Sequence, residues 1–452
     1  MLQRAPHQPA PRKIAVVGSG ISGLSAAWLL SQTHDVSLLE ADERIGGHSN
    51  TVIAMTERGP VPVDTGFIVY NTPTYPNLTA LFEHIGVETQ PTEMSFAVSL
   101  DQGKLEYSGA DLNGLFVQRS NLFRPRFHGM IRDLLRFYRQ APRDLPSLGD
   151  ETLEHYLDRN RYGTAFRDDH LYPMAAAIWS TPVGSIGDYP ARSFIRFCEN
   201  HGLLKITDRP VWRTVKGGSR SYVDRLAGEI SGTVQRANAV VQVERFQYGT
   251  RVYFADGVYA DYDEVVLACH ADQALKILKG PTDRERRVLG SFRYTKNHAI
   301  LHSDDRLMPI RRKAWAAWNY LADRGRPEDL MVTYWMNRLQ SIDETNPLFV
   351  TLNPTMAPQP SKIHYEKTYE HPVFDQAAMA AQAELWSLQG EGGVWYCGAY
   401  FGAGFHEDGL QAGLAVAEAI GDVRRPWTVE NESGRIMLPE VAKAAIARSR
   451  AA

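Results

Sequence analysis

The stretch KIAVVGSGISGLSAAWLL, residues 13–30, decides the expected fold of this chain. Its apolar start, IAVV, is typical of a short buried strand, and LSAAWLL is typical of a helix. Between them Gly18, Gly20 and Gly23 follow the GxGxxG spacing. In that spacing the glycines allow a tight turn, a close approach of the backbone to a pyrophosphate, and close packing of the helix on the strand.

The next apolar run, DVSLLE, ends in Glu40. A carboxylate at the end of the second strand accepts hydrogen bonds from ribose hydroxyls, and a helix N-terminus attracts the phosphate charge. The series of strand, turn, helix, strand and acid therefore predicts a dinucleotide-binding βαβ unit. An ordinary βαβ turn without a ligand is the alternative.

The bulk composition excludes several classes of protein. A chain of 452 residues predicts two or more domains, and a net charge of −3 argues against a dedicated nucleic-acid partner. The three cysteines (Cys198, Cys269 and Cys397) are widely spaced without a CxxC pair, which predicts no disulfide framework, no metal site and a reducing cytoplasm. No run approaches the ~18 uninterrupted apolar residues of a membrane span.

A second glycine-rich turn, WYCGAYFGAGFHEDGLQAG, lies near the other end of the chain and continues into a helix. We expect that helix to begin near Gly409 and Leu410, with Asp408 as its N-cap. Its dipole and free N–H groups would stabilise negative charge on a bound group. A purely structural capping role for Glu407 and Asp408, with His406 a spectator, is the alternative.

The segments EADERIGGHSNT and VDTGFIVYN follow the first motif, and with it they resemble the flavin-containing amine oxidase superfamily. The resemblance implies one non-covalent FAD, with its diphosphate at the first turn and its flavin ring at the second, and the backbone of Val240 at the adenine. His48 stands where the family has arginine, and Gly398-Ala399-Tyr400 lacks the usual acid, so either backbone and water or Asp64 would hold the ribityl chain. The implied cofactor-binding residues are Gly18, Ser19, Gly20, Ser22, Gly23, Glu40, Ala41, Arg44, Gly46, Gly47, His48, Thr65, Gly66, Phe67, Ile68, Val240, Gly398, Asp408, Gly409 and Leu410.

The resemblance also implies an α/β fold, a Rossmann-type FAD-binding domain with an inserted α+β substrate domain. Antiparallel strands are predicted around Asp256-Gly257. The expected parts are a flexible N-terminus (1–12), the FAD-binding domain (13–84, 206–284 and 391–424), the substrate or cap domain (85–205 and 285–390) and a peripheral C-terminal extension (425–452).

The chemistry implied by the family is removal of a hydride from a C–H bond onto flavin N5. No nucleophile or metal constellation is visible in the sequence. His406, Tyr400 and Lys296 are the candidate catalytic residues, with His270 and His298 as further polar groups, and a structural role is the alternative for each.

The segments GFHEDGLQAG, YWMNRLQ, VTLNP and FIVYN more narrowly resemble bacterial predicted NAD/FAD-binding proteins that are associated with cyclopropane fatty acyl synthases. This implies a dehydrogenase or desaturase of fatty-acyl chains. An oxidase of a small amine, with Phe405 and Tyr400 as paired aromatics, and a non-redox flavoprotein isomerase remain open.

Residues 119–143, RSNLFRPRFHGMIRDLLRFYRQAPR, carry seven arginines against one acid, Asp133. From Pro125 onward the pattern predicts an amphipathic helix with its arginines on one face. Such a helix can lie on an anionic membrane, so we expect this segment to rim the substrate entrance of a cytoplasmic protein and to touch the inner face of the membrane. An ordinary cap-domain helix with solvated arginines is the alternative.

Overall fold

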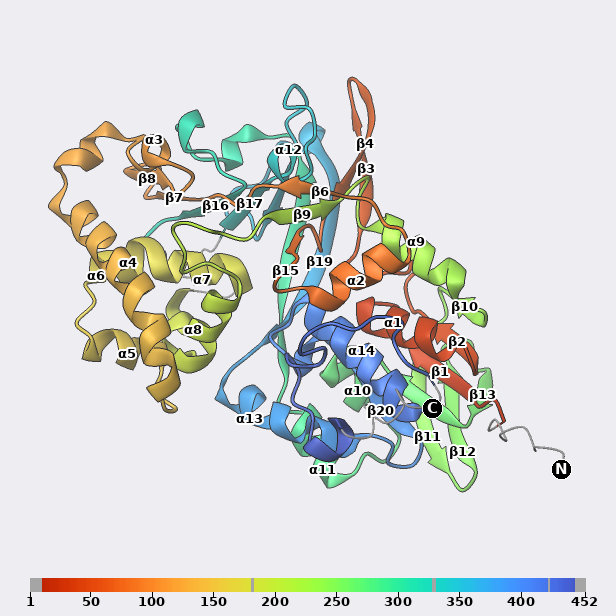
Figure 1. Cartoon of the computed structure of the whole chain (residues 1–452). Helices are drawn as coiled ribbons and strands as arrows, with labels where there is room; N and C mark the ends of the chain where they lie inside the picture. Colours follow the sequence, from red (N-terminus) through yellow and green to blue (C-terminus); the bar gives the residue numbers. More distant parts are fainter. Residues whose placement is uncertain (1–9, 180–182, 327–330, 422, 444–452) are drawn as a thin grey trace.

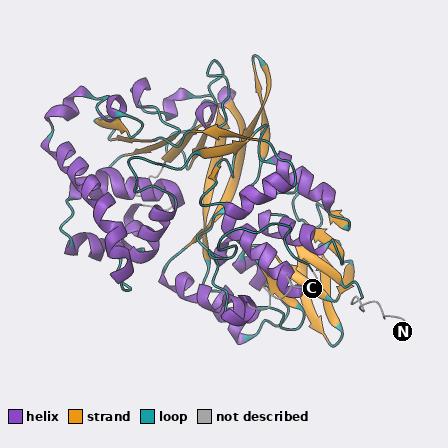
Figure 2. Cartoon of the chain, viewed as in Figure 1, coloured by secondary structure: helices purple, strands orange, loops and turns teal. Residues whose placement is uncertain are grey.

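The computed structural model describes residues 10–179, 183–326, 331–421 and 423–443. Two layered bodies lie side by side, one built around a parallel sheet and one around a long antiparallel sheet with a cap of helices (Figure 1). Figure 2 shows that helices gather on the outer side of the cap and around the parallel sheet, while the long strands run between the two bodies.

The first body contains a five-stranded sheet in the order β10-β2-β1-β14-β20, in which all neighbouring strands are parallel. Except for the edge strand β10, its strands are short and largely buried runs, as a parallel sheet covered by helices requires. This confirms the predicted Rossmann-type α/β domain. The strands are β1 (Lys13–Val17), β2 (Asp35–Leu39), β10 (Thr233–Gln235), β14 (Glu264–Leu267) and β20 (Val394–Tyr396).

Helices cover this sheet, and the two glycine-turn helices, α1 and α14, pack directly on each other (Figure 1). An antiparallel three-stranded sheet stands beside them and confirms the strands predicted around the turn at Gly257. The helices are α1 (Ile21–Leu30), α2 (Pro76–His84), α9 (Arg220–Glu229), α10 (Ala271–Ile277), α11 (Asp283–Leu289), α13 (Gln376–Leu385) and α14 (His406–Ile420); the strands are β11 (Val240–Phe246), β12 (Gly249–Phe254) and β13 (Tyr259–Tyr262).

The second body is a seven-stranded sheet in the order β19-β15-β18-β17-β16-β7-β8, in which β16 and β7 are parallel and the other pairs antiparallel. The strands are β7 (Phe96–Leu100), β8 (Leu105–Ser108), β15 (Arg293–His302), β16 (Trp318–Ala322), β17 (Met331–Trp335), β18 (Phe349–Leu352) and β19 (Ile363–Val373). The cap helices are α3 (Leu112–Leu115), α4 (Pro125–Asp144), α5 (Leu153–Arg159), α6 (Thr164–Phe166), α7 (Tyr172–Trp179) and α8 (Ala191–Asn200).

Short elements join the two bodies. A two-stranded hairpin and a small three-stranded sheet lie where the chain crosses between them (Figure 1). These elements are β3 (Thr51–Thr56), β4 (Gly59–Asp64), β5 (Tyr70–Asn71), β6 (Thr89–Thr92) and β9 (Trp212–Val215). Helix α12 (Met336–Leu339) connects β17 to β18 within the second body.

The predicted domain boundaries stay a prediction. The packing shows which hydrophobic core several segments near them join. Val288 and Ala378, which fall in the range assigned to the cap, lie in the core around the parallel sheet. The C-terminal extension is less peripheral than expected, because Arg425 and Ile436 are buried against the same body. Residues 1–9 of the predicted flexible N-terminus lie outside the described residues.

Candidate functional site

The first glycine turn leaves the start of α1 uncovered. Gly18 has a φ of +101°, and a Cβ there would lie 2.9 Å from the Ala268 carbonyl oxygen. A Cβ at Gly23 would lie 1.8 Å from the Gly18 carbonyl oxygen, so both positions need glycine. A Cβ at Gly20 would meet nothing within 4 Å, and Gly20 is the N-cap of α1 without a side-chain cap. The free N–H groups of α1 therefore form a site for an anion.

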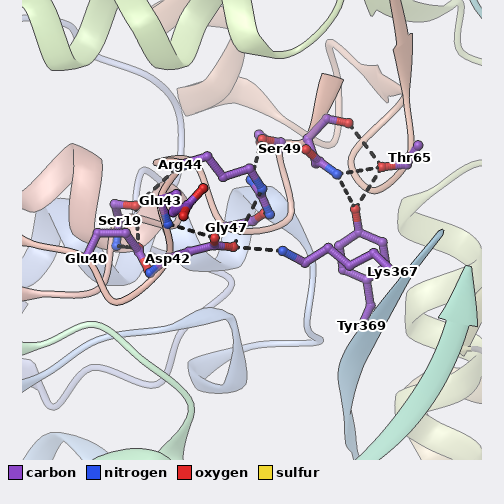
Figure 3. Close-up of polar contacts among 12 residues, drawn as sticks. Ser19, Glu40, Asp42, Glu43, Arg44, Gly47, Ser49, Thr65, Lys367 and Tyr369 are labelled. Carbon is purple, nitrogen blue, oxygen red and sulfur yellow. Dashed lines mark hydrogen bonds and ion pairs between the residues drawn. The ribbon is translucent and has the colours of Figure 1, made fainter. Parts of the chain in front are cut away.

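Glu40 stands beside this turn, as the sequence predicted. Its carboxylate accepts hydrogen bonds from the Ser19 N–H at 2.9 Å and from the Ser19 hydroxyl at 2.5 Å (Figure 3). The carboxylate is thus held at the end of β2, next to the opening of α1. From that position a carboxylate accepts hydrogen bonds from ribose hydroxyls.

The second glycine pair brings another backbone segment against the first turn. A Cβ at Gly47 would lie 2.9 Å from the Gly20 Cα, and Gly46 has a φ of +110°. Arg44 donates a hydrogen bond to the Gly47 carbonyl at 2.6 Å, and Lys367 of β19 reaches Asp42 at 2.8 Å (Figure 3). Arg44 therefore holds this loop in shape, and the loop is tied to the sheet of the second body.

The second glycine turn differs in detail from the expectation. Helix α14 begins at His406 with Phe405 as its N-cap, so it starts earlier than Gly409 and Leu410. Asp408 is the third helical residue, not the N-cap. Its carboxylate accepts from the N–H groups of Phe405 at 2.8 Å and Ala403 at 3.0 Å. The sequence did not reveal this because a capping box places its acid three residues inside the helix.

Gly409 serves the contact between helices. A Cβ there would lie 2.8 Å from the Ser22 Oγ and 2.9 Å from the Ile21 Cγ2, and a Cβ at Gly413 would lie 2.2 Å from the Ser22 carbonyl oxygen. These two glycines let α14 lie directly on the first turns of α1. The two helix starts are therefore fixed relative to each other.

One cavity of about 1320 Å³ joins both glycine turns to the interior of the cap. Residues of the parallel-sheet body form one part of its wall, and residues of the cap helices form another part. The predicted cofactor residues that line it are Gly18, Ser19, Gly20, Ser22, Glu40, Ala41, Gly47, His48, Thr65, Gly66, Phe67, Ile68, Val240 and Gly398. Those that lie outside its lining are Gly23, Arg44, Gly46, Asp408, Gly409 and Leu410.

Within the described part of the chain, two buried polar atoms in the wall of the cavity have no hydrogen-bond partner, His48 Nε2 and the Tyr400 hydroxyl; His270 Nδ1 also makes no hydrogen bond and lies 3.6 Å from the Glu370 carboxylate. His371 of β19 lies 5.4 Å from His48 between ring centroids, and burial lowers the pKa of both imidazoles. Neutral imidazoles and a tyrosine can donate hydrogen bonds to a ligand rich in oxygen and nitrogen acceptors. The open α1 terminus, Glu40 and these unpaired donors fit FAD, which would supply a hydride acceptor when bound.

The candidate catalytic residues fall into different environments. His406 lines the cavity, stacks on Phe67 at 3.8 Å, and bonds through Nε2 to Ser49 at 2.9 Å and Tyr222 at 2.8 Å. Burial lowers the pKa of His406 to about 3, so it is neutral at pH 7. Tyr400 also lines the cavity, and burial raises the pKa of its hydroxyl well above the usual value.

Three other polar residues considered from the sequence lie outside the cavity wall: Lys296, His298 and Asp64. Lys296 is exposed on β15 and is not part of the cavity wall. His298 is also exposed and lies 3.1 Å from Glu366. Asp64 is fully buried outside the cavity, where it accepts hydrogen bonds from Thr51 at 2.6 Å and from the Ser219 hydroxyl at 2.8 Å. Its carboxylate is thus engaged elsewhere and does not reach the cavity wall.

Sequence reasoning missed part of the site. His371 and Tyr369 on β19 lie close to His48, and Tyr294 on β15 stacks on His270 at 4.2 Å. No local motif marks these residues, because strand pairing between distant segments brings them to the cavity. The histidine that replaces arginine at position 48 was the one available signal.

Further features bear on the cofactor. Cys397 is buried and is not part of the cavity wall. Within the described ranges, no group of three or more His, Cys, Asp or Glu side chains is arranged to hold a metal ion. None of the helices in the described residues is both long and apolar enough to cross a membrane.

Most of the chain is similar in sequence to one known protein family. The model of the flavin containing amine oxidoreductase family matches residues 21–421. An L-amino acid oxidase from Cerastes cerastes is 55% identical over 42 residues, which are only 9% of this chain and 8% of that protein. An L-amino-acid oxidase from Notechis scutatus scutatus is 52% identical over 48 residues, 10% of this chain and 9% of that protein.

Solved structures share the fold at low sequence identity. A putrescine oxidase variant has a TM-score of 0.66 at 14% identity, covering 90% of this chain and 98% of that chain. A CLA-producing fatty acid isomerase from P. acnes has a TM-score of 0.63 at 14% identity, covering 89% and 97%. The family match spans most of the chain, and the cavity has the donors and the open helix terminus that FAD requires. This chain therefore belongs to the flavin-containing amine oxidoreductase family and is a FAD-dependent oxidoreductase that holds its FAD non-covalently.

Proposed function

We propose that this oxidoreductase is a dehydrogenase, or desaturase, of fatty-acyl chains. The observation that supports the proposal best is the continuation of the cofactor cavity into the cap. The cavity volume of about 1320 Å³ exceeds the ~300–1,000 Å³ typical of small-molecule sites. It therefore has room for a long substrate in addition to the cofactor.

The wall of the cavity within the cap is mostly apolar, with Asp111, His170 and Arg209 among its polar members. Its apolar part is formed by side chains of α3, α4 and α7, namely Leu115, Met130, Leu134, Met174 and Ile178. Burying methylene groups against such a wall stabilises a bound chain by ~0.8 kcal/mol per methylene. A hydrocarbon chain thus matches this wall better than a polar molecule does.

The proposed reaction removes two hydrogens from adjacent carbons of the acyl chain and leaves a double bond. One hydrogen leaves as a hydride, for which bound FAD is the acceptor, and the neutral imidazole of His270 in the cavity wall would accept the other as a proton. The cap residues exclude water and orient the chain. Tyr400 lines the cavity, and its hydroxyl, which has no hydrogen-bond partner among the described residues, can donate to the substrate or the cofactor.

Oxidation of a small amine has weaker support from this site. Tyr400 packs on Phe292 at 5.2 Å and Phe405 packs on Phe197 at 4.9 Å. Among the ring contacts of the described residues, Tyr400 and Phe405 do not form a pair. Putrescine oxidase and the fatty acid isomerase share the same fold, so the fold allows either substrate class and the wall of the cavity favours the second.

Anaerobic reduction of the flavin tests the proposal. The holoprotein is mixed in turn with dispersed acyl lipids of different chain lengths and with a panel of amines, and the flavin absorbance near its visible maximum is followed. We expect bleaching by acyl lipids only. Ile178→Trp narrows the part of the cavity inside the cap and should shift the substrate preference toward shorter acyl chains. Ile310→Trp, at an exposed side chain outside the cavity wall, should leave the preference unchanged. Bleaching by amines alone would overturn the proposal.

A further inference from the structure

Helix α4 forms part of the cavity wall with one side and faces solvent with another. Ile131, Leu134, Leu135 and Tyr138 line the cavity, while Phe127 and neighbouring apolar side chains enter the core of the cap. Figure 1 shows α4 on the outer side of the cap, away from the parallel sheet. The predicted amphipathic helix is thus present, and it borders the cavity directly.

The solvent side of α4 carries a groove of about 680 Å³. Ile131 and Leu135 line both this groove and the main cavity, so the two spaces adjoin along the same helix. The groove is basic along its length. Its lining residues are His128, Ile131, Arg132, Leu135, Arg136, Arg139, Gln140, Arg143 and Asp144.

The arginines of the groove differ in their hydrogen-bond and ion-pair partners. Arg136 donates to the carbonyl oxygens of Asn160 and Arg161, both at 3.0 Å, and is therefore a structural residue. Arg139 and Arg143 are exposed, and among the described residues neither forms a hydrogen bond or ion pair. The Arg132 side chain is 79% exposed and lies 3.6 Å from the buried Asp133.

Apolar side chains stand exposed at the N-terminal end of the same helix. Phe123 is 85% exposed, Leu122 is 43% exposed, and Leu112, which also lines the cavity, is 75% exposed. Large apolar side chains beside a basic helix face are the combination that inserts into the headgroup region of a bilayer. Arg139 and Arg143, which have no carboxylate partner among the described residues, match anionic lipid headgroups in charge, and the Arg132 side chain is 79% exposed despite its ion pair with Asp133.

We propose that α4 docks on an anionic phospholipid bilayer through Arg132, Arg139 and Arg143, with Phe123 and Leu112 inserted in the interface. Docking places the cap wall, and through it the cavity, against the membrane that holds the acyl chains. This inference rests on the proposed function for its substrate, although membrane binding itself is measured without turnover.

Vesicle co-sedimentation tests the docking. Holoprotein is mixed with phosphatidylcholine vesicles and with vesicles containing phosphatidylglycerol, at low and at high salt. We expect binding to the anionic vesicles only, and loss of binding at high salt. Each basic residue near an anionic surface contributes about fivefold, so Arg132→Glu/Arg139→Glu/Arg143→Glu should lower the partition coefficient by at least about 100-fold.

A matched control carries the same charge change elsewhere. Arg236→Glu/Arg284→Glu/Arg286→Glu alters exposed arginines of the parallel-sheet body and should retain vesicle binding. Equal loss in both variants, equal binding to both vesicle types, or binding to neither would overturn the proposal. Phe123→Ser gives a second test that keeps every charge, since loss of the exposed ring should weaken binding to anionic vesicles; unchanged binding counts against insertion of Phe123.

The same samples separate this inference from the proposed function. Vesicle binding as described, together with a flavin that no acyl lipid bleaches, would reject the acyl substrate and keep the docking surface. Flavin bleached by detergent-dispersed acyl lipid, together with no vesicle binding, would reject the docking surface and keep the substrate.

Discussion

Replacing Gly413 by alanine probes the contact between α1 and α14. In the native packing a Cβ at this position would lie 2.2 Å from the Ser22 carbonyl oxygen and 2.5 Å from the Ser25 Oγ. The carbonyl belongs to the backbone of α1 and cannot rotate away, so the two helices must separate. Because both helices begin beside the cavity, their separation also disturbs the place where FAD binds.

The size of the effect follows from two opposing terms. Overpacking of a well-packed interior costs ~1–3 kcal/mol, and the clash with backbone argues for the upper end of that range. Alanine in a helix interior gains ~1 kcal/mol over glycine. We therefore expect Gly413→Ala to destabilise the fold by ~2 kcal/mol. Gly228, in α9, is the control, since a Cβ there would meet nothing within 4 Å. Gly228→Ala should gain ~0.5–1 kcal/mol.

Thermal unfolding of the holoproteins and FAD titration of the apoproteins are the assays. Gly413→Ala should unfold below the native protein and bind FAD more weakly, and Gly228→Ala should do neither. Gly409→Ala should lie between, because its Cβ would crowd side-chain atoms, the Ser22 Oγ at 2.8 Å and the Ile21 Cγ2 at 2.9 Å, while the nearest backbone atom outside α14, the Ala399 nitrogen, lies at 3.6 Å. The reasoning is refuted if Gly413→Ala unfolds at or above the temperature of the native protein.

Three further predictions concern the same site. Glu40→Ala should weaken FAD binding by ~1.5–3 kcal/mol, the scale of a hydrogen bond to a charged group, and unchanged affinity in a fluorescence titration would exclude a cofactor role for this carboxylate. Arg435→Met removes the guanidinium that donates to Asp408 at 2.6 Å and should destabilise the fold by ~3–5 kcal/mol, with partial rescue by Asp408→Asn; equal melting temperatures of the single and double variants would contradict this. Burial lowers the pKa of His406 to about 3, so below the usual histidine pKa of ~6.5 the unfolded chain binds a proton that the folded chain does not, and stability should fall as pH drops from 6.5 toward 3. Burial also lowers the pKa of His201 to about 3 and the pKa of His170, His302 and His371 to about 4, so His406→Gln should reduce the decline in melting temperature between pH 7 and pH 5 without abolishing it. Asp64, whose pKa burial raises to about 6, offsets part of the loss.

The parallel sheet and the first glycine turn could be predicted from the sequence because their signals are local. Gly18, Gly20 and Gly23 lie within one turn, and Glu40 ends the next strand. The spacing alone specifies that these residues meet at one edge of the sheet. The amphipathic pattern likewise gave the start of α4 at Pro125.

The other details of the site could not be predicted, because they depend on contacts between segments that are distant in the sequence. Asp408 was expected at the N-cap, but the helix starts three residues earlier because the Asp408 carboxylate accepts the Phe405 N–H. Gly409 was assigned to the flavin, whereas its lack of a side chain serves the packing on Ser22. His371 reaches His48 through pairing in the long sheet, which no spacing in the sequence records.

The mass of the acyl chain after a single anaerobic turnover tests the proposed dehydrogenase most directly. Holoprotein is mixed without oxygen with an excess of an acyl lipid of matching chain length, the flavin absorbance is followed, the reaction is quenched, and the chain is analysed by mass spectrometry. We predict a product that has lost two hydrogens, with one equivalent formed for each FAD reduced. A product of unchanged mass with a moved double bond, formed while the flavin ends oxidised, would contradict a dehydrogenase and indicate an isomerase.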